Sequence, residues 1–170
     1  MRFISILVLA ATASIAALTL AKKNHSAQKP QINKEATIVH KHATATFGLD
    51  SWDEKAFNEI DGAPKLTRVT STKSYQGDIE GQGKLEYLMM YRPDGTATFV
   101  GLERITGTIG GRSGSFVLQH SGVFESGEAK TILSILPGSG TGDLSNISGQ
   151  GAFNVRHDPP YTMTLDYNLD

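Results

Sequence analysis

From Ala43 to the C-terminus, apolar residues recur at every second position in short runs that are separated by glycine-rich breaks. In the run from Ser115 to Phe124, Phe116, Leu118 and His120 fall on one face, and polar residues are frequent on the other. A period of two is typical of β-strands, and no long stretch keeps the period of an amphipathic helix. The pattern predicts about eight strands, at residues 43–53, 65–75, 84–91, 96–106, 115–125, 129–136, 151–157 and 161–169.

The strands follow one another through short connections, so we expect an antiparallel series. The segment Arg92-Pro93-Asp94-Gly95 is a clear hairpin turn, because proline presets φ and glycine accepts a positive φ. An eight-stranded series closes most simply into an all-β, mostly up-and-down barrel. A two-sheet sandwich is the alternative. Residues 54–60 and 143–147 are each long enough for one helical turn only.

The N-terminal segment differs from the rest of the chain. Arg2 precedes an apolar run that ends at Leu20, and small residues stand at the minus-three and minus-one positions before Lys22. This layout predicts a signal peptide at residues 1–21, followed by a polar tether at 22–42 and a barrel domain at 43–170. We therefore expect a periplasmic or secreted protein that has no membrane contact after cleavage. An uncleaved membrane anchor is the alternative.

Charge and composition exclude several classes of function. The 170 residues include 16 Lys and Arg against 17 Asp and Glu, and no cysteine. The balance argues against nucleic-acid binding, and the missing cysteine excludes disulfides and thiol catalysis. The glycine-rich segment at 138–142 lacks the helix of a phosphate loop, and His40 and His42 lack a third metal ligand. We expect no cofactor and no metal.

Glu103 and His120 are the candidate catalytic residues. Each shares a strand face with apolar side chains, and a buried carboxylate or imidazole is costly unless it is paired or functional. Together they could act as acid and base, or orient a polar group of a ligand. The alternative is a pair that only stabilises the core or a subunit contact. The candidate ligand-binding residues are Tyr87, Phe99, Glu103, Phe116 and His120.

The strand at 84–91 is apolar on both faces, with Leu85, Tyr87 and Met89 opposite Leu88 and Met90. A barrel can bury only one face of a strand in its interior. We therefore expect a homo-oligomer that covers the other face.

Seven ordered sequence blocks identify a family resemblance. They are Ser51–Glu54, Pro64–Thr67, Gly77–Gly81, Tyr91–Gly95, Phe99–Arg104, Gly111–Phe116 and Pro137–Gly142. From about Thr44 to the C-terminus, the chain resembles the bacterial family called domain of unknown function 3224. The resemblance implies a barrel of the allene-oxide-cyclase-like type with no established activity. The catalytic residues of the cyclases have no match in this chain.

Three functional hypotheses remain open. The first is an exported barrel that holds a small, mostly apolar ligand without catalysis, which the aromatic and methionine-rich strands favour. The second is an isomerase or cyclase in which Glu103 or His120 moves a proton. The third is a structural oligomer with a filled barrel.

Overall fold

A computed structural model describes residues 40–156 and 159–169, and the proposed leader, most of the tether and His157 lie outside these residues. No helix within the described residues is long and apolar enough to cross a membrane. The strands are β1 (Lys41–Asn58), β2 (Lys65–Gly77), β3 (Ile79–Tyr91), β4 (Ala97–Ile109), β5 (Arg112–Glu125), β6 (Glu128–Ile135), β7 (Thr141–Gly142), β8 (Ser148–Val155) and β9 (Tyr161–Asn168).

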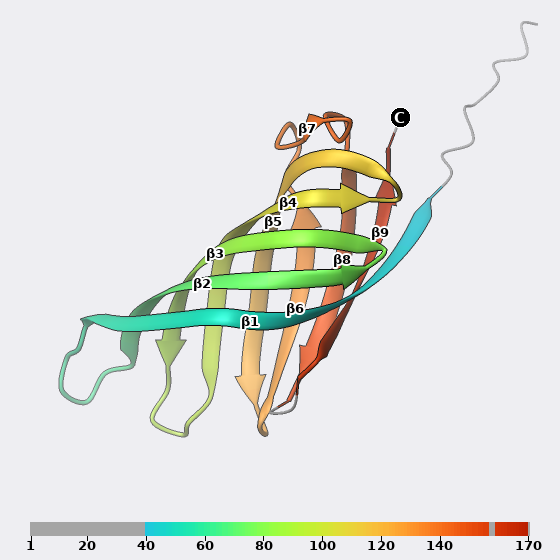
Figure 1. Cartoon of the computed structure of the whole chain (residues 1–170). Coiled ribbons are helices and arrows are strands. Elements are labelled where there is room, and N and C mark those ends of the chain that lie inside the picture. Colours follow the sequence, from blue (N-terminus) through green and yellow to red (C-terminus); the bar gives the residue numbers. More distant parts are fainter. Residues whose placement is uncertain (1–39, 157–158, 170) are drawn as a thin grey trace, which may run out of the picture. The chain divides into compact units, whose positions relative to one another are not determined.

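Eight of these strands close into an antiparallel barrel (Figure 1). Each strand pairs with the next along the chain, except that β6 pairs with β8, and β1 closes the barrel by pairing with β9. The very short β7 is an additional strand that pairs with the start of β5. The all-β, mostly up-and-down barrel expected from the sequence is confirmed.

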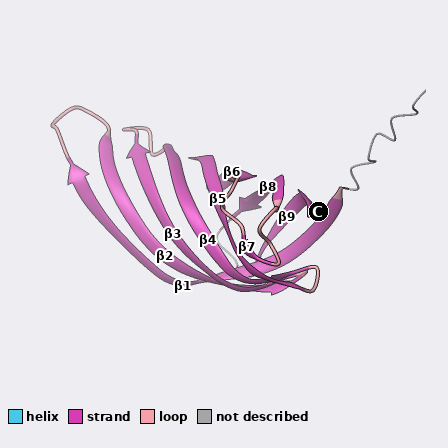
Figure 2. Cartoon of the chain, turned by 90° about the horizontal axis from the view of Figure 1, so that it is seen from above, coloured by secondary structure: helices cyan, strands magenta, loops and turns pink. Residues whose placement is uncertain are grey.

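Several strands are longer than the sequence pattern predicts, and β1 to β4 are seen as long, curved strands in Figure 2. β1 continues to Asn58, so the helical turn considered for residues 54–60 is wrong. β3 begins at Ile79 instead of residue 84, because Gly81 and Gly83 lie within the strand and do not break it. At Gly81 any side chain would overlap the carbonyl group of Thr106 on β4, so glycine permits close approach of the two strands.

The interior follows the two-residue period. On β2, the buried side chains are Thr67, Val69, Ser71, Lys73 and Tyr75, and the alternate residues point outward. The hairpin between β3 and β4 has the expected turn, in which the amide of Gly95 donates to the carbonyl of Arg92 and Gly95 has a φ of 83°.

The two ends of the barrel differ. At the end near β7, residues 143–147 form hydrogen-bonded turns instead of a helical turn, and the buried side chains of Leu144 and Ile147 close the interior. The opposite end carries the β3–β4 and β5–β6 turns. We call this second end the mouth.

Candidate functional site

A buried ion pair lies in the interior of the barrel. The ammonium group of Lys73 on β2 donates to Oε2 of Glu103 on β4 across 2.9 Å. The side chains are 2% and 0% exposed. The hydroxyl of Tyr75 donates to Oε1 of Glu103 at 2.8 Å. Both carboxylate oxygens of Glu103 therefore have a donor.

His120 on β5 extends this cluster. Its Nδ1 lies 2.8 Å from the hydroxyl of Tyr87, and its Nε2 lies 3.1 Å from Oε2 of Glu103, out of line for a hydrogen bond. An unprotonated Nε2 would point its lone pair at the negative carboxylate, so we infer that Nε2 carries the proton and that the Tyr87 hydroxyl donates to Nδ1. We call Lys73, Tyr75, Tyr87, Glu103 and His120 the polar cluster.

Two strand glycines make these contacts possible. Gly83 stands between Lys73 and Glu103, because β3 separates β2 from β4 and Gly83 is the register partner of Lys73. A Cβ at Gly83 would overlap Oε1 of Glu103. In the same way, Gly101 is the register partner of both Tyr87 and His120, and a Cβ there would overlap the ring of Tyr87. Each glycine lets a long side chain cross the neighbouring strand.

The cluster keeps one positive and one negative charge. Burial opposes the ionisation of Glu103, but the charge of Lys73 and the contact with His120 outweigh it and lower the pKa of Glu103 to about 2. Burial lowers the pKa of His120, and the nearby Glu103 only partly offsets this, so the imidazole is neutral near pH 7. Burial, followed by the charge of Glu103, raises the pKa values of Tyr75 and Tyr87 well above the usual range, so both phenols stay protonated.

A cavity of about 290 Å³ opens between this cluster and the mouth. Lys73 and Tyr87 are its polar lining residues toward the cluster. Tyr91 and Phe124 lie toward the turns at the mouth, since they stand at or next to the ends of β3 and β5. The other lining side chains are Phe47, Leu49, Trp52, Met89, Phe99, Ala129, Phe153, Val155 and Tyr161.

All five candidate ligand-binding residues point into the barrel, but they do not all reach the cavity. Tyr87 and Phe99 line it, and their ring centroids are 5.0 Å apart. Glu103 and His120 contact each other as expected, but lie behind the cavity wall. Phe116 is part of the core that includes the closed end.

Lys73 and Tyr75 are the two residues of the polar cluster that the sequence does not single out, and Lys73 is the one that carries a charge. Lys73 shares its strand face with Val69 and Tyr75, which is the same signal that singled out Glu103 and His120. Ser71 and Thr67 on that face reduced the apolar contrast.

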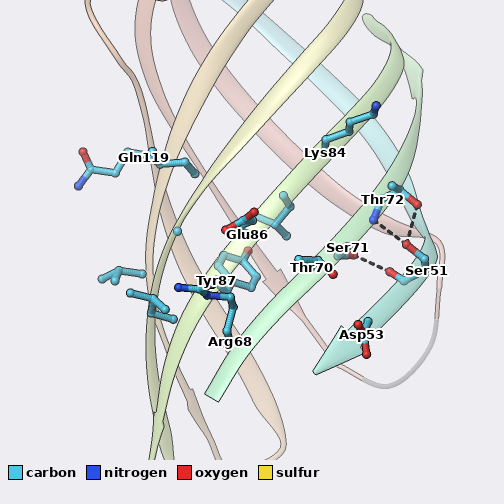
Figure 3. A pocket seen from close by; sticks show the side chains of 15 residues that line it. Ser51, Asp53, Arg68, Thr70, Ser71, Thr72, Lys84, Glu86, Tyr87 and Gln119 are labelled. Atoms are coloured by element: carbon cyan, nitrogen blue, oxygen red, sulfur yellow. Dashed lines mark hydrogen bonds between the residues drawn. The ribbon is translucent and has the colours of Figure 1, made fainter. Parts of the chain in front are cut away.

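The outer surface of β1 to β5 carries a second, open trough of about 770 Å³ (Figure 3). Its polar residues include Arg68 and Lys84 as well as Asp53 and Glu86, so both signs of charge are present. Leu88, Val100 and Leu102 form an apolar strip in the trough, and each is about half exposed, at 47%, 48% and 51%. Leu88 therefore lies on the outer face, opposite Tyr87, as the alternation on this strand predicts.

The remaining sequence motifs form no chemical site within the described residues. The glycine-rich segment at 138–142 leads into turns that pack on β5, and Oγ1 of Thr141 lies 2.9 Å from Oγ of Ser115. Nδ1 of His42 lies 2.7 Å from a carboxylate oxygen of Asp166 in an exposed pair. No group of three side chains suited to a metal occurs in residues 40–156 and 159–169.

Comparison with known proteins identifies the family. A family model described as a protein of unknown function (DUF3224) matches residues 43–167. The chain belongs to this family. A solved structure of a DUF3224 protein of unknown function from Shewanella oneidensis MR-1 is similar, with 26% sequence identity and a TM-score of 0.68 over 78% of this chain and 98% of that chain. A search of curated proteins found no match.

Proposed function

We propose that this DUF3224 barrel holds a small, mostly apolar ligand in the cavity at its mouth and does not catalyse a reaction. The observation that carries the proposal is the cavity of about 290 Å³, which is lined mainly by aromatic and aliphatic side chains and has Lys73 and Tyr87 on one side. Ligand sites in proteins combine such an apolar wall with a few polar groups. The volume equals that of about ten water molecules, so the expected ligand has about ten to thirteen non-hydrogen atoms.

The chemistry of the polar cluster argues against the isomerase or cyclase hypothesis. A general base works best when its pKa is near the working pH, whereas the pKa of Glu103 is about 2. His120 is neutral, but Tyr87 occupies its Nδ1 and the ring does not line the cavity. The open cavity also argues against the third hypothesis, a structural oligomer with a filled barrel.

Export is the second part of the proposal. It rests on the signal-peptide pattern of residues 1–21, and a periplasmic or secreted barrel with an apolar cavity would keep a poorly soluble molecule away from water.

Binding of naphthalene, a rigid ten-carbon probe, tests the ligand proposal. At roughly 0.5 kcal/mol per non-hydrogen atom, the Kd is on the order of 0.1 mM, which calorimetry can measure. Ala129→Trp places a large ring in the cavity and should abolish binding. Lys130→Trp is the matched control, because the neighbouring Lys130 is exposed and does not line the cavity. Failure of the wild-type protein to bind, or equal binding by both variants, would contradict the proposal.

A further inference from the structure

The ammonium group of Lys73 has unused hydrogen-bonding capacity beside the cavity. An ammonium group has three donors. Within residues 40–156 and 159–169, Lys73 makes one hydrogen bond, to Glu103. Its Nζ also lies 4.8 Å from the ring centroid of Phe47 and 5.3 Å from that of Phe153. These two rings stabilise the charge through cation–π contact, but they are not hydrogen-bond acceptors of ordinary strength.

Because Lys73 is buried, its unused donors favour a ligand that can accept a hydrogen bond. Its side chain is 2% exposed, yet it lines the cavity together with Tyr87. A buried donor without an acceptor costs free energy, and a ligand oxygen at this place would remove that cost. The cavity therefore favours a molecule that brings an acceptor to Lys73.

The negative charge of Glu103 decides whether the acceptor on the ligand can be charged. Its carboxylate already balances Lys73, and Tyr75 holds the second oxygen. His120 on the other side of the carboxylate adds no positive charge near pH 7. A ligand carboxylate would place a second negative charge beside a single ammonium ion in a desolvated site, which is unfavourable.

We propose that the ligand is uncharged and carries a carbonyl-type oxygen that accepts a hydrogen bond from Lys73, with its apolar body against the aromatic wall of the cavity. This inference rests on the proposed function and narrows the class of ligand. The contact is non-covalent, because the ammonium group of Lys73 donates to Glu103 and offers no lone pair to attack a carbonyl carbon.

Three probes of one shape test the inference. They are 2-acetylnaphthalene, which has a neutral carbonyl, 2-ethylnaphthalene, which has no oxygen, and 2-naphthoate, which is an anion at pH 7. A hydrogen bond from a charged donor should make the ketone bind about tenfold to a hundredfold more tightly than the hydrocarbon. The carboxylate should bind more weakly than the ketone.

The variant that checks the role of Lys73 combines Lys73→Met with Glu103→Gln, so that no buried charge is left without its partner. The readout is the ratio of ketone affinity to hydrocarbon affinity within each protein, and in the double variant this ratio should fall to about one. Lys84→Met, on the exposed face of β3, is the control and should keep that preference.

The outcomes separate the two proposals. Equal binding of ketone and hydrocarbon, or tighter binding of 2-naphthoate, would overturn the neutral-acceptor inference and leave the ligand proposal standing. A ketone preference that survives in the double variant would also overturn it, because the preference would not come from Lys73. If the wild-type protein binds none of the three probes or naphthalene, the ligand proposal fails and this inference fails with it.

Discussion

Replacing Lys73 by methionine keeps most of the side-chain volume but removes the ammonium group that lies 2.9 Å from Oε2 of Glu103. The carboxylate then stays buried with Tyr75 as its remaining well-aligned donor. Breaking a buried ion pair in this way costs about 3–5 kcal/mol. For a domain of this size, 1 kcal/mol corresponds to about 3–4 °C, so we expect the Tm to fall by roughly 10–20 °C at pH 7.

The pH dependence gives this prediction a second, independent readout. The pKa of Glu103 is lowered from 4.5 to about 2 in the folded wild type. Its ionised form therefore contributes about 3 kcal/mol above pH 4.5, and this contribution is lost as the pH falls toward 2. In the Lys73→Met variant, the ammonium charge no longer opposes the effect of burial, so the pKa of Glu103 is higher than in the wild type. The variant therefore loses less stability than the wild type as the pH falls. The difference in stability between the two proteins should shrink steadily from pH 7 to pH 3.

Urea denaturation followed by circular dichroism measures both effects, with Glu103→Gln and the double variant completing a thermodynamic cycle. The double variant should recover part of the loss, because it leaves no unpaired charge. A cost below about 1 kcal/mol for Lys73→Met, compared with the expected range for a buried pair, would refute the reasoning. So would a cost that stays constant from pH 7 to pH 3.

Three further predictions concern other parts of the chain. Gly101→Ala should destabilise the barrel by about 1–3 kcal/mol in urea denaturation, because the added Cβ would overlap Tyr87, whereas Gly48→Ala, which meets no atom within 4 Å, should have little effect. The mature protein should begin at Lys22 in intact-mass measurements of the soluble envelope fraction, and a soluble cytoplasmic chain that still carries the leader would contradict export. The apolar strip on the outer face should pair with the same strip of a second copy, because the charged residues that flank it have both signs. Size-exclusion chromatography at roughly 50 µM should therefore show a dimer, and Leu102→Lys should disrupt it. A wild-type monomer would exclude this contact.

The strand faces were predictable because each depends on neighbours along a single strand. Phe116, Leu118 and His120 share one face, and the same alternation places Glu103 between Phe99 and Ile105. These local patterns were enough to indicate that a carboxylate and an imidazole face the interior on adjacent strands.

The position of Lys73 could not be derived in this way. Its ammonium group meets Glu103 only because β3 contributes a glycine at the point where the two side chains cross. That contact depends on the register among three strands, which a single sequence does not reveal. The sequence pattern also predicts a break at the glycines of β3, so the predicted strand begins at residue 84 and does not include Gly83.

The burial of the loop at the end of the barrel near β7 is not predictable from the sequence for a related reason. Leu144 and Ile147 are buried, but they stand in a segment rich in glycine and serine that has no period of two or 3.6. Their burial comes from packing beneath the turns next to β7, so nothing local to the segment indicates it.

Because the side chain of Glu103 crosses Gly83, the residue that fits at one of these two positions depends on the residue at the other. A Cβ at position 83 would collide first with side-chain atoms of Glu103 and Tyr75, not with backbone, so a shorter residue at 103 would remove the main obstacle. Among relatives, we therefore expect the glycine and the carboxylate to be kept or replaced together. Position 101 is different, because a side chain there would also strike the backbone carbonyl of Glu86, and no single partner substitution would compensate for its loss.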